Sequence, residues 1–199
     1  MFSPSPKIRI GIYAAFFVTA LVALILQMRE AGKDNQAPLP RLGAVPTFSL
    51  TADDSTAFTT NEIRGHVIIA DFIFTNCGGP CPLMSAQMQE LQREFQKESD
   101  IRLLSFSVDP DNDTPGVLRT YGQRFGALSG KWTFLTGLKS TIYNLTRNGF
   151  HLALDEDQDA IAHSTKFVLI DKETSIRGYY DSDDRGSMKR LVEDARSLH

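Results

Sequence analysis

From residue 44 onward, the apolar and polar positions alternate between patterns typical of strands and patterns typical of helices. Residues 67–74 are apolar almost throughout, which is typical of a strand buried on both faces of a sheet. Apolar side chains then recur at steps of four, three and four, at Met84, Met88, Leu91 and Phe95. This spacing places them on one side of a helix, and it predicts a helix that packs on the sheet and ends near Glu98.

Similar patterns predict elements along the rest of the chain. Thr114 before Pro115 is typical of an N-cap followed by proline at the first helical position, and it predicts a helix toward Phe125. The other predicted elements are strands at 46–51, 101–108 and 132–135, a helix at 138–148 ended by Gly149, a hairpin at 166–171 and 176–180, and a last helix containing Met188, Leu191, Ala195 and Leu198. This alternation predicts an α/β fold, a thioredoxin-like sandwich with an added N-terminal strand region.

The amino-terminal segment has a different character. Residues 10–26 carry no charge, and the uncharged stretch continues to Met28 before Arg29. As a helix, residues 10–28 would extend about 28 Å, close to the roughly 30 Å of a bilayer's hydrocarbon core. We therefore expect one transmembrane helix at 10–28 after a short tail at 1–9. A cleaved signal peptide is the main alternative, but no small-x-small cleavage site follows the apolar run.

Residues 29–43 are polar and contain Pro38 and Pro40, which predicts a semi-extended tether to a domain at 44–199. Basic residues are balanced on the two sides of the apolar segment and do not set its orientation. A short tail inside and a large domain outside is the simpler topology, and it suits the cysteine chemistry considered below. We expect a single-pass protein of a bacterial inner membrane whose domain faces the periplasm.

Composition narrows the function. The chain has 21 basic and 24 acidic residues and a net charge of -3, which excludes binding to nucleic acid through electrostatic attraction to its phosphates. Its two cysteines are too few for a disulfide-stapled scaffold or a four-cysteine zinc site. Any cysteine chemistry must therefore come from a single pair.

Cys77 and Cys81 lie four residues apart in the segment FTNCGGPCP, between the buried strand and the methionine-lined helix. Backbone N–H groups and the dipole at a helix start favour thiolates, so both sulfurs are expected to be reactive. Such a pair can form a reversible disulfide or bind a soft metal such as reduced copper or zinc. A structural disulfide is the alternative, but closing so small a loop would stabilise the fold by only about 2 kcal/mol.

A third ligand would favour metal binding. His163 stands just before the predicted strand at 166–171, and in a thioredoxin-like sheet the loop entering that strand runs beside the cysteines. His163 is therefore the first candidate, with an ordinary surface histidine as the alternative. His66 is expected at the opposite end of its strand, His151 as a structural histidine, and His199 at a frayed terminus.

Four motifs occur in a fixed order: FTNCGGPCP, SVDPDNDTP at 107–115, WTFLTG at 132–137 and HSTKFVLID at 163–171. Together they resemble the Sco/SenC family, membrane-anchored copper-binding thioredoxin-like proteins of cytochrome c oxidase assembly. The resemblance covers about residues 43–198. It implies that Cys77, Cys81 and His163 bind copper, that the copper-site subunit of cytochrome c oxidase is the partner, and that a thiol reductant serves the pair.

Two positions depart from the family's usual pattern. Gly78 follows the first cysteine where proline is usual, and Ala162 precedes the histidine where an acidic residue is common. Glycine raises the entropy of ordering a metal loop, and a lost carboxylate removes an influence on the histidine. Nearby, Asp109 and Asp113 are expected only to make turns and cap the next helix.

The resemblance implies a copper metallochaperone that carries one copper ion to the oxidase. The second hypothesis is a thiol-disulfide oxidoreductase in which Cys77 attacks and Cys81 resolves, keeping the oxidase cysteines reduced. A peroxide-reducing enzyme is disfavoured, because Phe74 stands where a threonine or serine is expected.

Overall fold

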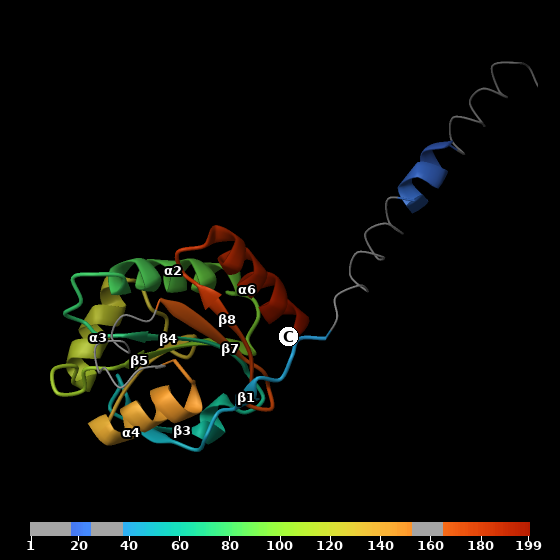
Figure 1. Cartoon of the computed structure of the whole chain (residues 1–199). Helices are drawn as coiled ribbons and strands as arrows, with labels where there is room; N and C mark the ends of the chain where they lie inside the picture. The colour runs from blue at the N-terminus through green and yellow to red at the C-terminus, as the bar shows by residue number, and fades with distance from the viewer. Residues whose placement is uncertain (1–16, 25–37, 153–164) are drawn as a thin grey trace, which may run out of the picture. The chain divides into compact units, whose positions relative to one another are not determined.

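The computed structural model describes residues 17–24, 38–152 and 165–199. Residues 39–199 form one compact unit around a sheet whose strand order is β1-β8-β7-β4-β5-β6-β2-β3 (Figure 1). The strands are β1 (Gly43–Ala44), β2 (Ser49–Ala52), β3 (Ala57–Thr59), β4 (Val67–Ile73), β5 (Ile101–Ser107), β6 (Trp132–Thr136), β7 (Lys166–Ile170) and β8 (Ser175–Asp181). Strands β4, β5 and β6 are parallel, and β7 pairs antiparallel with β4.

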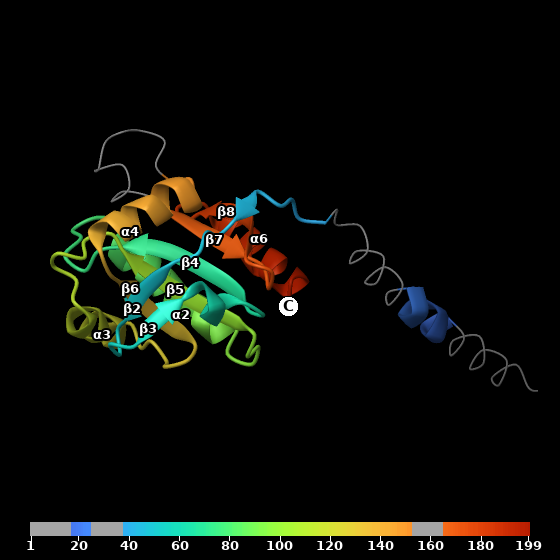
Figure 2. The ribbon, with the colours of Figure 1, turned by 90° about the horizontal axis from the view of Figure 1, so that it is seen from below.

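Helices cover both faces of this sheet. They are α2 (Cys81–Glu94), α3 (Pro115–Arg124), α4 (Lys139–Asn144) and α6 (Arg185–Ser197), with a 3-10 turn η1 (Thr60–Ile63) and a π-helical turn η2 (Leu145–Gly149). Helices α2, α3 and α6 bury apolar side chains on one face. Helix α4 and η2 cover the other face, to which β2 also contributes buried side chains and which Figure 2 shows from below.

Successive side chains of the central strand β4 point to opposite faces of the sheet, so they join two different hydrophobic clusters. Val67, Ile69 and Ile73 of β4 face the α2 side, whereas Ile68 and Phe72 face the α4 side. All seven residues of β4 are buried, as the apolar run predicts. The helix stripe is also confirmed: Met84, Met88, Leu91 and Phe95 are at most 3% exposed.

The α/β fold is confirmed, and most element boundaries fall close to their predicted places. The added N-terminal region is larger than expected, because β1 and β3 were not predicted and the early strand starts at Ser49 rather than residue 46. Helix α2 ends at Glu94 instead of near Glu98. Thr114 caps α3 as expected, since its side chain accepts the Val117 N–H.

Most of the predicted membrane anchor at residues 10–28 lies outside the described residues. Residues 17–24 are helical with exposed side chains. Among the described residues, no helix has both the length and the apolar character needed to cross a membrane.

Two glycines of α3 make a matched pair for testing how tightly this helix packs. A Cβ added at Gly122 would lie 2.6 Å from the ring of Phe134, which is 1% exposed and has no room to retreat, whereas a Cβ at Gly116 meets nothing within 4 Å. We expect Gly122→Ala to lower the free energy of unfolding by about 1–3 kcal/mol. Gly116→Ala should raise it by a few tenths to about 1 kcal/mol. Urea unfolding measures both, and equal effects would contradict the close packing of α3 on β6.

Candidate metal and dithiol site

The topology brings distant segments to one edge of the sheet. Because β4, β5 and β6 are parallel, the segments that follow them begin at the same edge. Strand β7 runs the other way, with Val168 opposite Ala70 and Ile170 opposite Ile68, so its first residue Lys166 also lies at this edge. The residues after β4 and the first residue of β7 therefore lie at the same edge although about 90 positions separate them.

The two cysteines lie where the chain passes from β4 into α2. A turn follows the strand, with the Cys77 N–H donating to the Phe74 carbonyl at 3.3 Å. Cys81 is the first residue of α2 and is 1% exposed, whereas Cys77 is partly exposed. Of the predicted metal ligands, the described residues bring these two together, because the Cys77 and Cys81 side chains are hydrogen-bonded to each other.

The sulfur of Cys77 occupies the position of a helix cap. Pro80, the N-cap residue of α2, provides no side-chain cap. Instead, Cys77 Sγ accepts the backbone N–H of Gly79 at 3.4 Å and also that of Cys81. Free N–H groups at a helix start stabilise negative charge, so this arrangement favours the Cys77 thiolate.

The two thiols differ in acidity. Burial alone would raise the pKa of Cys77, but hydrogen bonds from the Cys81 thiol and from the N–H groups of Cys81 and Gly79 outweigh it and lower the pKa below the ordinary value. The pKa of Cys81 is raised, first by burial and then because its thiol donates to Cys77. At neutral pH, the partly exposed sulfur of Cys77 is therefore the nucleophile and the buried Cys81 keeps its proton, so the expectation that both sulfurs are reactive is wrong for Cys81.

This asymmetry predicts selective alkylation. With limiting iodoacetamide at pH 7, the reduced chain should carry at least about tenfold more label on Cys77 than on Cys81, because the thiolate is the reactive form and Cys81 is shielded. Peptide mass spectrometry reads the two sites. In denaturant the label should divide about evenly, and the same even division in the native protein would rule out the proposed asymmetry.

A carboxyl group lies buried on the same side of β4 as the cysteine helix. Asp71 is fully buried, and burial raises its pKa to about 7, although the Ser105 hydroxyl opposes the shift. Ser105 also accepts the Trp132 indole N–H at 2.9 Å. The charge of Asp71 contributes to the raised pKa of Cys81, so the two groups interact.

The raised pKa of Asp71 predicts a pH-dependent stability. Folding binds a proton between the unfolded value of 3.8 and the folded value of about 7, so this stabilisation is complete below pH 4 and is lost as pH rises through 7. In the metal-free reduced chain, Asp71→Asn should raise the free energy of unfolding by roughly 1–3 kcal/mol at pH 8 and change it little at pH 4. Urea unfolding at both pH values measures this. Exposed Asp183→Asn is the control, and a pH-independent difference for Asp71→Asn would contradict the assignment.

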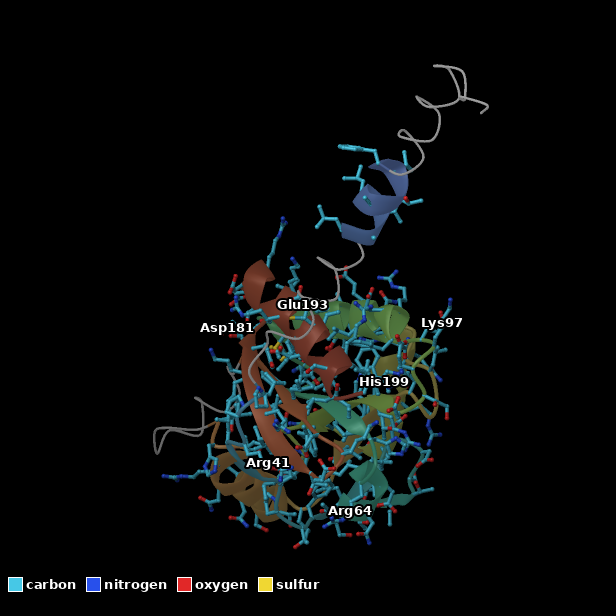
Figure 3. All side chains as sticks on the ribbon, turned by 90° about the vertical axis from the view of Figure 1, so that its right-hand side faces the viewer. Arg41, Arg64, Lys97, Asp181, Glu193 and His199 are labelled. Atoms are coloured by element: carbon cyan, nitrogen blue, oxygen red, sulfur yellow. The ribbon has the colours of Figure 1, made fainter. Side chains whose placement is uncertain are left out.

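The histidines are distributed around the fold. His163 lies outside the described residues, which resume at Thr165, where the carbonyl accepts the Ser182 N–H. His66 precedes β4 at the opposite edge, as expected. His199 forms an ion pair with Asp100 at that same edge, at 2.6 Å. Asp181 pairs with Lys166 at the edge where the cysteines lie, and Figure 3 shows it apart from His199. His151 is exposed, so the expectation of a structural histidine is wrong. Within the described parts of the chain, no three metal-ligating side chains meet.

Asp113 makes the expected turn, since its N–H donates to the Asp109 carbonyl at 2.9 Å, but its side chain has a further role. It is fully buried, and its carboxylate binds Thr75 in the segment leading to Cys77. Its sequence signal was that of a helix cap, because an acidic residue before Thr-Pro is typical of a helix start. Only the folded structure shows the contact across 38 positions.

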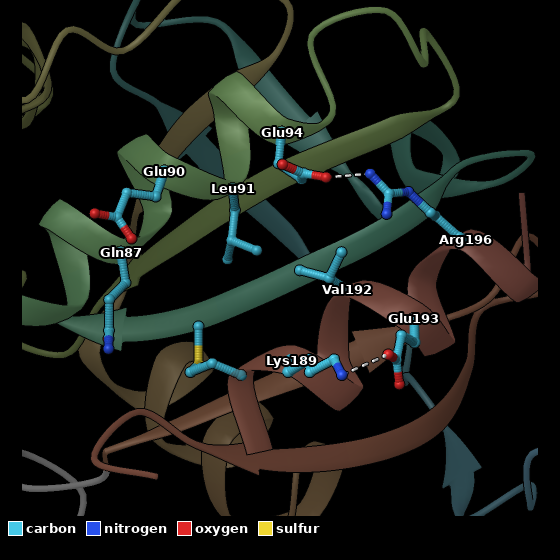
Figure 4. A pocket seen from close by; sticks show the side chains of 9 residues that line it. Gln87, Glu90, Leu91, Glu94, Lys189, Val192, Glu193 and Arg196 are labelled. Atoms are coloured by element: carbon cyan, nitrogen blue, oxygen red, sulfur yellow. Dashed lines mark hydrogen bonds and ion pairs between the residues drawn. The ribbon is translucent and has the colours of Figure 1, made fainter. Parts of the chain in front are cut away.

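Two cavities lie away from the cysteines. A groove of about 410 Å³ runs between α2 and α6, with ion pairs Glu94–Arg196 and Lys189–Glu193 along its rim (Figure 4). A second cavity of about 490 Å³ lies beside the β2–β3 hairpin and is lined by Asp53, Arg102 and Arg119 among others. Neither is lined by a cysteine or histidine, so the dithiol remains the chemical centre of the described structure.

The fold and the reactive pair define a thioredoxin-like dithiol protein. The SCO1/SenC family model matches residues 37–198, and the chain belongs to this family. The SCO1 protein homolog of Bacillus subtilis is 31% identical over 157 residues, covering 77% of this chain and 81% of that protein. A putative copper-binding protein of Stutzerimonas stutzeri is 29% identical over 147 residues, covering 71% of each chain.

Solved structures agree with this assignment. A SCO1/SenC family lipoprotein from Bacillus anthracis is 33% identical with a TM-score of 0.71, covering 78% of this chain and 95% of that one. BsSco, a member of the Sco family of cytochrome c oxidase assembly proteins studied for a disulfide switch, is 30% identical with a TM-score of 0.71, covering 82% and 98%. The family predicted from the four sequence motifs is therefore confirmed.

Proposed function

We propose that this protein is a copper metallochaperone that binds one copper ion through Cys77, Cys81 and His163 and delivers it to the copper site of cytochrome c oxidase. The observation that carries the proposal is the contact between the two cysteine side chains at the start of α2. The start of β7, three residues beyond His163, lies at the same edge of the sheet. The similarity to the putative copper-binding protein of Stutzerimonas stutzeri and to BsSco, a member of a family of cytochrome c oxidase assembly proteins, supports the same function.

The proposed ligands, two cysteines and one histidine, suit a soft metal ion that is transferred to another protein. Two sulfurs and an imidazole favour reduced copper, and binding requires Cys81 to lose its proton. Cys77 is partly exposed on a loop, so an incoming thiolate or imidazole of the oxidase subunit can approach the ion and take it by ligand exchange. Copper is the transported ion in this proposal, and the partial exposure of Cys77 allows the ion to be released to the partner.

Attachment to a membrane fits this role. The proposal includes a tail at 1–9, a transmembrane anchor at 10–28 and a tether at 29–43 that hold the domain at the periplasmic surface of a bacterial inner membrane. Confinement raises the effective concentration of the domain near the oxidase without additional contact area. The lipoprotein from Bacillus anthracis supports membrane attachment within the family.

A second candidate is a thiol-disulfide oxidoreductase, favoured by the lowered pKa of Cys77 beside a protonated Cys81. The Cys77 thiolate would attack a disulfide of the oxidase subunit and release one thiolate. Cys81 would then lose its proton and attack Cys77, which releases the second thiolate and leaves a Cys77–Cys81 disulfide. Two electrons pass to the subunit, and an external thiol reductant restores the pair.

Copper titration of the reduced chain under anaerobic conditions tests the proposal. The parent should bind one equivalent, and His163→Ala should weaken binding by at least about tenfold because one of three ligands is lost. His151→Ala, which changes an exposed histidine, is the matched control and should bind like the parent. The rate of thiol exchange with a small disulfide is measured on all three proteins.

The outcomes separate the two candidate functions. If His163→Ala binds copper as tightly as the parent while its exchange rate falls, the carrier function is wrong. If the parent binds one equivalent and the variant loses it with exchange unchanged, a purely redox function is wrong.

A further inference from the structure

Asp113 binds the chain just before the cysteine loop. Its carboxylate accepts the Thr75 hydroxyl at 2.5 Å and the Thr75 backbone N–H at 3.1 Å. The same carboxylate accepts the Ser107 hydroxyl at 2.6 Å. Asp113 is fully buried, so these bonds form away from water. Thr75 stands two residues before Cys77.

The cysteine loop needs such an anchor on its amino-terminal side. On the carboxyl-terminal side, Cys81 is fixed by α2 and by its burial in the core. Between the cysteines, Gly78 and Gly79 are exposed, and a Cβ at either would meet nothing closer than 3.7 Å. Neighbouring atoms therefore do not constrain this part of the loop, and glycine backbones lose more entropy than others when they are ordered.

The two hydroxyl groups that donate to Asp113, those of Thr75 and Ser107, define two separate arms. One arm, through Thr75, leads directly to Cys77. The other arm, through Ser107, leads back into β5, where Ser107 Oγ also accepts the Asp109 N–H at 3.1 Å. Both arms are hydroxyl bonds to one buried carboxylate, so they should contribute similarly to stability. Only the Thr75 arm reaches the dithiol.

We propose that Asp113 is a positioning residue for the metal and dithiol site, acting through Thr75 to hold Cys77 Sγ against the N–H groups of Gly79 and Cys81 where the chain enters α2. Asp113 does not touch the copper or the sulfurs. It keeps the start of the glycine loop in place, so that the sulfur receives the Gly79 and Cys81 N–H bonds before any ion arrives. This inference rests on the proposed function for its copper readout and is independent of it for its thiol readout.

The test compares the two arms in the full chain. Thr75→Val removes the hydroxyl on the cysteine side, and Ser107→Ala removes the hydroxyl on the strand side. Thr75→Ser restores the hydroxyl and is the rescue variant. Each protein is measured for the affinity of reduced copper by competition with a chromophoric chelator, for the pH profile of iodoacetamide reaction at Cys77, and for its midpoint of urea unfolding.

The expected result separates positioning from stability. Thr75→Val should bind copper at least about tenfold more weakly, and its Cys77 alkylation profile should move to higher pH, as when a supporting bond behind a ligand is lost. Ser107→Ala should lower the unfolding midpoint about as much but stay within roughly twofold of the parent in copper affinity, with an unmoved profile. Thr75→Ser should recover both properties.

Two results would overturn the inference. One is a Thr75→Val protein whose copper affinity and alkylation profile match the parent. The other is an equal loss in Ser107→Ala, because Asp113 would then act only through stability. If the parent itself binds no copper, the proposed function fails, and the alkylation profiles alone still decide whether Asp113 positions Cys77.

Discussion

The chemistry of this domain depends on the hydrogen bonds that the Cys77 sulfur accepts at the start of α2. Pro80 precedes this helix and provides no side-chain cap, and the sulfur instead accepts the N–H groups of Gly79 and Cys81. This contact connects the end of the central strand, the glycine loop and the helix that carries Cys81. It also gives the two thiols different acidities, on which both proposed functions depend.

Periodic apolar patterns predicted the frame of the fold because they record which side of each element is buried. The strand at 67–73 and the methionine stripe were recognised in this way. Strands β1 and β3 were missed because they span two and three residues and exist only through pairing with β8 and β2. Such short segments carry no period of their own.

The site was predictable to the extent that its residues are close in sequence. The spacing of Cys77 and Cys81 between a strand and a helix predicted their contact. The Thr75–Asp113 bond could not be found, because the local signal at Asp113 indicates a cap and its partner is 38 positions away. Asp71 offered an overlooked signal, since a lone carboxylate within an apolar strand that leads to a cysteine marks a buried group able to influence it.

The two cysteines differ in how firmly the fold holds them, and this difference determines which part of the site can move when the pair is oxidised or reduced. Cys81 belongs to a helix packed into the core, whereas Cys77 stands on a short loop that contains two exposed glycines. A change between the dithiol and the disulfide can therefore be accommodated by movement of residues 77–80, because Cys81 is held by α2 and by its burial in the core. A partner that distinguishes the reduced from the oxidised pair can do so by contacting this exposed loop.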